Sequence, residues 1–576
     1  MEMNSPRSLR FLPSLCALLL AGTAAAAHPA LSQEVDSPGE RVDRIMAEFQ
    51  GPDTPGAVLA VVKNGEIIFQ RAYGMANLTH GIPFVLETRT NIGSTSKQFT
   101  AFAIALLARE GRLSLDDDVR KYLPELPDFG EAVTLRHLLS HTSGYREFLN
   151  ALAMGGWNLE RADYIHRREI VEVVRRQPAL QNAPGAEWNY NNTGYALLAL
   201  VVEKVTGEDF GDWMGNNVFK PLGMTETVVR SDPTEIVPRS AQGYSPAEGG
   251  GFREAADIGA AVGAGGIYTT VGDLARWMRN LGSGEIGGRG VLEQMTTPFV
   301  LTTGDTTNYG FGLIMDRDRG LRRIQHGGAD AAHRSHFAYY PDLDEGLIVL
   351  TNNGGASGAV NGRIAEEFFG EHMDVREAGA EGDVPTSLDA SPFDPASYDP
   401  ASFDVFVGRY ELEIQPGFIL TFRRDGDRLL TEATGQSPVE ITPTSDSTFT
   451  LRSVDASLTF HRGEAGVVTG LTLHQNGNHA ARRMPDQGPA LDLSPLVGRY
   501  YSPEFETFYE AVVEGDSLVL RHRRLDPVIL THTSGDRFSG TFPLVEVVFT
   551  RDGSDGITGF RASNSRARDV LFERLR

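Results

Sequence analysis

Ser94 and Lys97 have the residue types and the spacing needed for acyl transfer. That reaction requires a nucleophile, a group that takes its proton, and hydrogen-bond donors for the oxyanion that develops. The two residues lie three positions apart, so on a helix they share one face. Ser-x-x-Lys is also common as a helix cap followed by a solvated lysine. The pair therefore predicts chemistry only in the company of further groups.

A second candidate element is Tyr190-x-Asn192, which stands just before the apolar run 196–202. Tyr190 offers a proton acceptor and Asn192 an amide hydrogen-bond donor. The alternative interpretation is a loop tyrosine and a turn asparagine. A helix that begins here would present both side chains at its N-terminus.

The third element is His326-Gly327-Gly328-Ala329. Its glycines leave room for a substrate against an edge strand, and the backbone N–H that follows them can point at a carbonyl oxygen. Taken alone, a histidine beside a Gly-Gly pair indicates only an ordinary turn. The serine–lysine, tyrosine–asparagine and histidine–glycine elements follow one another in a fixed order, and this order predicts a common site.

The ordered elements resemble those of the penicillin-recognising serine hydrolases of the class C β-lactamase type. Residues 134–144, 221–225 and 264–270 also look like stretches of that family, so the resemblance covers roughly residues 42–369. The whole chain is similar in layout to the three-domain D-aminopeptidases, which carry tandem C-terminal barrels. The resemblance implies a hydrolase that forms an acyl-enzyme.

The same resemblance implies the role of each residue. Ser94 attacks the substrate carbonyl, while Lys97 and Tyr190 share the roles of general base and proton relay. Neither is a base at its reference pKa of roughly 10, so the surroundings must lower one of the two values, and the sequence leaves open which. The N–H groups of Ser94 and Ala329 form the oxyanion hole, and Asn192 holds the substrate amide. The predicted catalytic residues are Ser94, Lys97 and Tyr190, and the predicted substrate-binding residues are Asn192, His326, Gly328 and Ala329.

His326 departs from the family pattern, because β-lactamases and transpeptidases usually carry lysine there to bind a substrate carboxylate. A neutral imidazole attracts a carboxylate less at pH 7. We therefore expect an exported serine hydrolase that acts on amide or ester bonds of small molecules or short peptides, of D-aminopeptidase, D-Ala-D-Ala carboxypeptidase or esterase type. The alternatives are a true β-lactamase and a non-catalytic penicillin-binding or sensing protein.

The sequence also predicts some of the strands and helices around these residues. Two β-rich runs, 58–62 and 67–69, flank Asn64-Gly65, a dipeptide that favours a tight hairpin turn. Apolar residues recur at helical spacing between Ser94 and Gly111, which predicts a helix that begins near the serine. Residues 361–369 look helical, and residues 337–340 and 347–351 look like strands. Together with the resemblance, this predicts an α/β (α+β) fold over residues 34–373, a β-lactamase/transpeptidase-like domain whose antiparallel sheet is flanked by helices.

The C-terminal part contains an internal repeat. The stretch 407–410 returns unchanged at 497–500, an offset of 90, and Gly426, Phe460 and Gly470 have counterparts 89 positions later. Each copy consists of short β-rich runs separated by Gly/Asp turns, which predicts two small antiparallel, lipocalin-like β-barrels at 403–485 and 491–576. An acidic, proline-rich stretch at 374–402 predicts a linker before them.

Composition excludes some partners. The formal charge is −23, and no Lys/Arg-rich run stands out, so nucleic acid is not an expected ligand. Residues 1–27 have the pattern of a secretory signal, which predicts a periplasmic or secreted protein. The apolar run in this segment is shorter than the roughly 20 residues of a bilayer span, so no stable membrane span is expected after cleavage.

No cofactor is expected, since neither a phosphate loop nor a nicotinamide fingerprint is present. Cys16 is the only cysteine and lies in the predicted signal, which excludes a thiolate metal site from the mature chain. His137 and His141 are four residues apart but lack the HExxH pattern, and we interpret them as structural rather than as metal ligands. The oligomeric state is left open.

Overall fold

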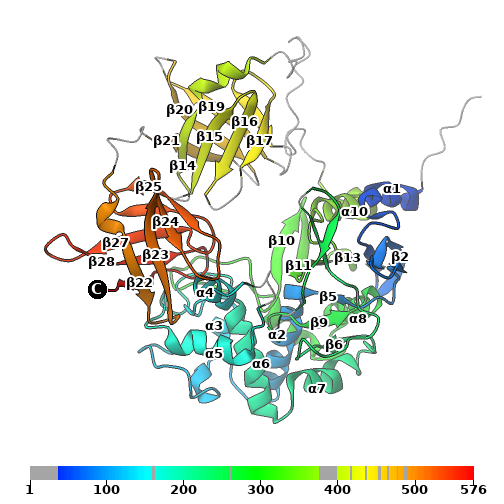
Figure 1. Ribbon diagram of the computed structural model, residues 1–576. Helices are drawn as coiled ribbons and strands as arrows, with labels where there is room; N and C mark the ends of the chain where they lie inside the picture. Colours follow the sequence, from blue (N-terminus) through cyan, green and yellow to red (C-terminus); the bar gives the residue numbers. More distant parts are fainter. Residues whose placement is uncertain are drawn as a thin grey trace, which may run out of the picture.

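The structure of the protein is a computed structural model (Figure 1) that describes residues 37–374, 398–484 and 491–576, apart from short gaps at 159–162, 248, 258, 260, 415–417, 435–437, 452–455, 464–465 and 476–477. The predicted signal at 1–27 and most of the predicted linker at 374–402 lie outside the described residues. A helix-covered sheet is followed by two closed barrels. This architecture confirms the predicted fold class.

A six-stranded antiparallel sheet forms the centre of the first domain, in the order β10-β11-β12-β13-β1-β2. β1 pairs with β13 although the two strands come from opposite ends of the domain, with Ala57 opposite Thr351. The predicted hairpin between β1 and β2 is confirmed, and Asn64 and Gly65 have the positive φ values of 52° and 77° that its tight turn requires. The strands of this sheet are β1 (Ala57–Lys63), β2 (Glu66–Tyr73), β10 (Ile314–Asp318), β11 (Leu321–Asp330), β12 (His333–Tyr340) and β13 (Glu345–Thr351).

β1 is buried on both faces, which explains why its sequence is an unbroken apolar run rather than an alternating one. Alternate β1 side chains enter two different cores. One core lies between the sheet and the helices α2 and α8, and the other lies under α1 and α10. The helices around the sheet are α1 (Pro38–Ile45), α2 (Lys97–Arg109), α8 (Val271–Ser283), α9 (Gly288–Met295) and α10 (Ala359–Phe369).

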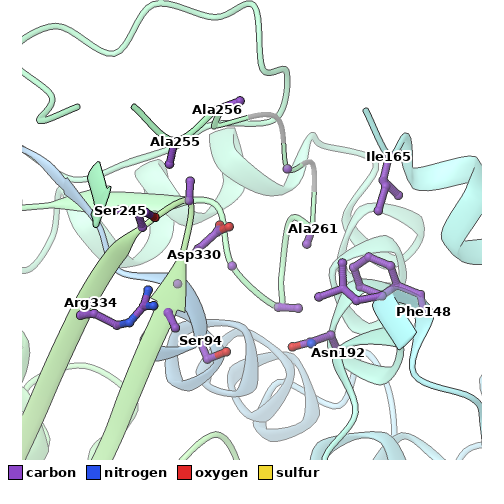
Figure 2. A pocket seen from close by; sticks show the side chains of 18 of the residues that line it. Ser94, Phe148, Ile165, Asn192, Ser245, Ala255, Ala256, Ala261, Asp330 and Arg334 are labelled. Carbon is purple, nitrogen blue, oxygen red and sulfur yellow. The ribbon is translucent and has the colours of Figure 1, made fainter. Parts of the chain in front are cut away.

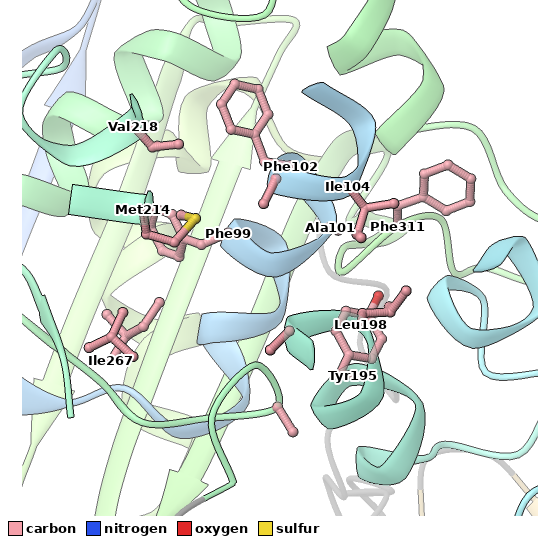
Figure 3. Packing of buried hydrophobic residues seen from close by; sticks show 14 of the residues in the cluster. Phe99, Ala101, Phe102, Ile104, Tyr195, Leu198, Met214, Val218, Ile267 and Phe311 are labelled. Atoms are coloured by element: carbon pink, nitrogen blue, oxygen red, sulfur yellow. The ribbon is translucent and has the colours of Figure 1, made fainter. Parts of the chain in front are cut away.

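α2 is the buried centre of the helical half of the domain. Every side chain from Lys97 to Leu107 is buried, and Figure 3 shows Phe99 beside Met214 and Ile104 near Phe311. A helix that is surrounded on all sides has no polar face, so Lys97 in its first turn is buried with the apolar residues. The other helices of this half are α3 (Leu135–Leu139), α4 (Phe148–Met154), α5 (Arg167–Arg176), α6 (Asn192–Thr206) and α7 (Phe210–Met214).

Small sheets complete the first domain. The three-stranded sheet β5-β9-β6 leads the chain into the serine segment, and two-stranded sheets pair β3 with β4 and β7 with β8. Among the described residues, no helix has the length and apolar character needed to cross a membrane. The strands are β3 (Met75–Asn77), β4 (Ile82–Pro83), β5 (Thr90–Asn91), β6 (Val228–Val229), β7 (Tyr244–Pro246), β8 (Phe252–Glu254) and β9 (Ile267–Thr269).

Two closed barrels of eight strands follow, barrel 1 from β14 to β21 and barrel 2 from β22 to β29. Gly470 and Gly559 occupy equivalent places, where an added Cβ would lie 2.5 Å from the Ala481 carbonyl oxygen and 2.4 Å from that of Phe572. This close approach of neighbouring strands explains why glycine recurs in the repeat. The strands of barrel 1 are β14 (Gly408–Leu412), β15 (Ile419–Asp425), β16 (Arg428–Ala433), β17 (Val439–Pro443), β18 (Thr448–Leu451), β19 (Ala456–Arg462), β20 (Val468–His474) and β21 (Asn478–Arg483). Those of barrel 2 are β22 (Gly498–Ser502), β23 (Thr507–Glu514), β24 (Ser517–Arg521), β25 (Val528–Ser534), β26 (Arg537–Ser539), β27 (Glu546–Arg551), β28 (Ile557–Ser563) and β29 (Val570–Arg574).

Barrel 2 is packed against α4 and α5 of the first domain (Figure 1, orange and cyan). Phe148 and Ile170 belong to the same buried apolar cluster as Tyr500 of the barrel. Arg146 and Glu504 form an ion pair across this interface, with 2.5 Å between Nε and Oε1 and side chains only 4% and 6% exposed. Barrel 2 is thus fixed on the domain that carries the serine.

Candidate active site

Ser94 lies in a 3₁₀ turn, η2 (Gly93–Ser96), that leads directly into α2. Gly93 has a φ of 47°, and its N–H donates to Oδ1 of Asn91 at 2.9 Å. A Cβ on Gly93 would lie 2.8 Å from the backbone nitrogen of Ala329, so only glycine lets this turn approach β11 so closely. The turn therefore holds Ser94 against the strand that carries the histidine–glycine element.

Lys97 is completely buried beside the serine. Its Nζ lies 3.0 Å from Ser94 Oγ, 2.7 Å from Oδ1 of Asn192 and 2.8 Å from the carbonyl oxygen of Ala264. Burial lowers the pKa of Lys97 from its ordinary value to about 7, and the charge of Arg566 acts in the same direction. A substantial fraction of this side chain is therefore a neutral amine near neutral pH.

Tyr190 stands at the entrance to α6, whose N-cap is Asn191. The ring of Tyr190 packs on His141, with centroids 4.3 Å apart, and lies 5.0 Å from Nζ of Lys97. Burial raises the pKa of Tyr190 well above 10, although its hydrogen bond with the Ser94 side chain acts in the opposite direction. Tyr190 is therefore a phenol, not a phenolate, at neutral pH.

Asn192 connects the lysine to a buried carboxylate. Its Oδ1 accepts from Lys97, and its Nδ2 donates to Oε1 of Glu147 at 2.8 Å. Glu147 is fully buried, and its other oxygen caps α4 by accepting from the N–H of Asn150 at 2.9 Å. Both amide atoms of Asn192 are thus bonded within the protein, and its contact with a substrate amide stays a prediction.

His326 lies inside β11, a strand that the sequence pattern did not predict. Its Nδ1–H donates to the Gly327 carbonyl oxygen at 2.6 Å, so in the neutral ring Nε2 accepts from the hydroxyl of Tyr309 at 3.1 Å. Burial, and then the charge of Lys97, lower the pKa of His326 to about 3. The imidazole is therefore uncharged at neutral pH, and its predicted contact with substrate stays a prediction.

The second half of β11 lies along the serine turn. β10 pairs with β11 only as far as Gln325, and beyond that point Thr95 Oγ1 donates to the His326 carbonyl oxygen at 3.2 Å. A Cβ on Gly328 would lie 2.0 Å from the Ile92 carbonyl oxygen, which explains the glycine there. The structure thus brings the backbone of Ala329 beside Ser94, and their joint role as an oxyanion hole stays a prediction.

His141 supports this assembly from behind. Its Nδ1 accepts from the N–H of Asn191 at 3.1 Å, and burial holds its pKa well below the usual value. Its ring also packs on Tyr309, with centroids 4.6 Å apart. Within the described ranges, no group of three or more His, Cys, Asp or Glu side chains is arranged to hold a metal ion. His141 thus positions the segment that carries Tyr190.

Ser94 opens on one side into a cavity of about 300 Å³, here called the Phe148 cavity (Figure 2). Phe148, Ile165 and Ala261 line one wall, and Asp330 lies on the other. Burial raises the pKa of the Asp330 carboxyl, and the nearby Asp257 acts in the same direction. Most of this cavity suits an apolar group.

On its other side Ser94 borders a larger cleft of about 940 Å³, here called the Trp188 cleft. Trp188, Tyr190 and His326 line it, together with Arg566 from barrel 2. The guanidinium carbon of Arg566 lies 5.0 Å from the centroid of the Tyr190 ring. A substrate bound at Ser94 can therefore extend in two directions, into chemically different spaces.

The first domain is similar to proteins of a known family. The chain matches the Beta-lactamase family over residues 42–367. It belongs to that family. It is 29% identical over 429 residues to penicillin-binding protein 4* of Bacillus subtilis (strain 168), which covers 71% of this chain and 90% of that protein. It is 30% identical over 317 residues to the D-aminopeptidase of Brucella anthropi, which covers 55% of this chain and 59% of that protein.

Two solved structures share the Beta-lactamase family fold of this chain. The octameric penicillin-binding protein homologue from Pyrococcus abyssi has a TM-score of 0.54 and 23% identity, and the match covers 77% of this chain and 99% of that one. The D-amino acid amidase from Ochrobactrum anthropi SV3 has a TM-score of 0.50 and 24% identity, covering 59% and 100%. These likenesses concern the fold alone, and the family predicted from the sequence is confirmed.

Two site groups lie outside the motifs that pointed to the Beta-lactamase family. Glu147 lies three residues beyond the family-like stretch 134–144, and this proximity was its one signal in the sequence. Arg566 belongs to the repeat: the offset between copies is 89 at Gly470 and Gly559 but 91 at Arg483 and Arg574. Each of these arginines donates to the carbonyl oxygen of the residue that precedes the first strand of its barrel, which supports the equivalence of Arg483 and Arg574. Two additional residues therefore fall in the β28–β29 loop that carries Arg566.

Proposed function

We propose that this chain is a serine hydrolase that cleaves amide or ester bonds of small molecules or short peptides through an acyl-enzyme on Ser94. The observation that carries the proposal is the distance of 3.0 Å between Nζ of the fully buried Lys97 and Oγ of Ser94, which borders the cavities. A nucleophile and a base within hydrogen-bond reach, with the base held by further groups, is the arrangement that nucleophilic catalysis needs.

In the proposed acylation step, neutral Lys97 is the base. As an amine it keeps two N–H donors, which suit Asn192 and Ala264, and its lone pair then faces Ser94 Oγ. The serine proton passes to Lys97 as Oγ bonds to the substrate carbonyl carbon. The resulting oxyanion is stabilised by the backbone N–H groups of Ser94 and Ala329.

The collapse of this intermediate requires a proton for the leaving group. Tyr190 is protonated and hydrogen-bonded to the Ser94 side chain, so it donates to the departing nitrogen or oxygen and is reprotonated from Lys97. In the hydrolysis of the acyl-enzyme, water loses a proton to the same groups and attacks the ester carbon. The bond between this carbon and Ser94 Oγ then breaks, and Oγ takes up the proton that the water gave. The cycle restores Ser94 and Lys97.

The proposed substrate class rests on the names of the relatives and on the neutral His326. One relative is named a D-aminopeptidase and another a penicillin-binding protein. His326 is neutral where a β-lactamase would carry a lysine, which favours a peptidase, amidase or esterase over a dedicated β-lactamase. Action in the periplasm or the medium, expected from the segment at 1–27, is part of the proposal and is tested by fractionation and N-terminal sequencing of the exported protein.

The decisive experiment compares the wild type with Ser94→Ala on a nitrophenyl ester, a D-alanine anilide and a chromogenic cephalosporin. We expect the variant to lose roughly 10⁴-fold or more in kcat. A fluorophosphonate probe should label Ser94 in the wild type alone. Undiminished turnover in Ser94→Ala would refute the nucleophile, and fast cephalosporin turnover without anilide hydrolysis would refute the substrate class.

The base is tested by pH. Because Lys97 accepts a proton only when neutral and its pKa is about 7, kcat/KM for the ester should rise from pH 5.5 to 8 with an inflection near that value. A profile that is flat through this range would contradict Lys97 as the base of the free enzyme.

A further inference from the structure

Arg566 brings a positive charge from barrel 2 into the Trp188 cleft. The β28–β29 loop that carries it is held at several points. The Arg566 carbonyl oxygen accepts from the N–H of Glu147 at 3.3 Å and from Nε2 of Gln181 at 3.3 Å, and Asn564 caps the loop by accepting from the N–H of Ala567 at 2.9 Å. The backbone under Arg566 is thus anchored to the first domain beside the serine.

The guanidinium of Arg566 differs from the other basic groups of the cleft. Arg334 donates to the carbonyl oxygens of His333 and Gly354 at 2.8 and 2.7 Å, and His326 is neutral. Arg568, two residues along, pairs with Glu187 at 2.8 Å. Among the residues that the structure describes, none accepts a hydrogen bond from the Arg566 guanidinium or pairs with it. Its five N–H donors are left for a ligand.

The position of Arg566 also selects a side of the substrate. Under the proposed mechanism Tyr190 gives its proton to the leaving group, so the leaving group lies on the Tyr190 side of Ser94, in the Trp188 cleft. The guanidinium lies over that same ring. The acyl group then enters the Phe148 cavity, which Arg566 does not line. An anion on the leaving group therefore meets Arg566, while an anion on the acyl group does not.

We infer that Arg566 binds a carboxylate on the leaving group, so that the preferred substrates are short peptides or esters whose departing part ends in a free carboxylate. The inference rests on the proposed function and narrows it to carboxypeptidase-type cleavage. Neutral His326 does not attract a negative charge, and Arg566 takes over this recognition. A planar guanidinium suits this task, because it binds a carboxylate through two parallel hydrogen bonds.

The test uses two activated esters of one acyl group, phenylacetylglycine, that differ only in the leaving group. One releases 3-hydroxybenzoate and the other 3-hydroxybenzamide. We expect the wild type to favour the carboxylate ester in kcat/KM by roughly 10- to 100-fold, since the free energy of a hydrogen bond to a charged group corresponds to a factor of that size. Arg566→Gln should bring the ratio close to one, and Arg566→Lys should restore part of it. The control is Arg561→Gln, an exposed position on β28, which should keep the wild-type ratio.

The ratio separates anion recognition from general effects of Arg566 on Lys97, because such effects change both rates alike. A wild-type ratio that Arg566→Gln leaves unchanged overturns the inference while hydrolysis itself stands. If the wild type hydrolyses neither ester, the proposed function fails. The anion site is then judged by calorimetric titration with 3-hydroxybenzoate and 3-hydroxybenzamide. Equal affinities, or a preference that Arg566→Gln retains, would overturn the inference there too.

Discussion

Barrels 1 and 2 are copies of one repeat, but they meet the rest of the protein differently. The buried cluster of barrel 1 consists of its own residues, whereas that of barrel 2 continues into α4 and α5. Barrel 1 contacts barrel 2 through Arg409, whose Nη1 donates to the His532 carbonyl oxygen at 3.0 Å (Figure 1, yellow and orange). A duplicated unit can thus keep its fold while one copy acquires a surface for the active-site domain.

The sharpest test of this difference is a matched pair of substitutions at Tyr410 and Tyr500. Both tyrosines are fully buried, and each donates to a carbonyl oxygen four residues earlier. We expect Tyr410→Ala and Tyr500→Ala each to cost about 4 kcal/mol in the unfolding free energy of its own barrel, because a large side chain leaves a cavity. Only Tyr500→Ala should also lower ester hydrolysis. Calorimetry and initial rates measure the two effects. Equal losses of activity would show that both barrels support the site to the same degree.

The next largest effect is expected at the ion pair between Arg146 and Glu504. Arg146→Met leaves Glu504 buried without its partner, which should cost about 3 kcal/mol of unfolding free energy at pH 7. Burial already raises the pKa of Glu504 against the effect of Arg146, so losing the arginine raises it further. The folded state then binds more protons than the unfolded state, and the deficit should shrink as the pH falls from 7 to 5. Denaturant unfolding at several pH values measures it.

The double variant Arg146→Met/Glu504→Leu serves as the control for that experiment. It removes both charges and restores an apolar contact, so most of the stability should return. A double variant as unstable as Arg146→Met would show that the ion pair is not what attaches barrel 2.

The smallest effect is expected for Arg409→Gln at the contact between the barrels. One hydrogen bond to His532 is lost, and two further nitrogens of Arg409 are buried without a partner, so removal should cost no more than about 1 kcal/mol. Ester hydrolysis should equal that of the wild type. A large drop in activity would mean that barrel 1 influences the site through barrel 2, so that both barrels would matter for hydrolysis.

The parts of the site that are local in sequence were predictable from it. Ser94 and Lys97 sit one turn apart, and Tyr190 and Asn192 flank the cap of α6, so their residue types carry the signal. The tight turn at Asn64-Gly65 was equally predictable from the sequence, since few other dipeptides adopt its backbone conformation.

The missed parts depend on contacts between distant segments. β11 contains two glycines and a histidine, and close approach to the serine turn, rather than β-propensity, places them there. Whether Lys97 or Tyr190 has the lowered pKa depends on burial from several elements, which no local pattern encodes. Arg566 required knowledge of where barrel 2 packs. The repeat predicted the barrel itself but not the surface that it covers.

The pairing of β1 with β13 also sets the order in which the protein can assemble during synthesis. Paired residues of the two strands lie 282 to 294 positions apart along the chain, so the β1–β2 hairpin leaves the ribosome with an apolar edge that stays open until β13 follows. Pairings over such distances form slowly and leave unpaired edges open to misassembly. The loop with Arg566 emerges later still. The surroundings of Ser94 are therefore complete only after the β28–β29 loop of barrel 2 has been translated.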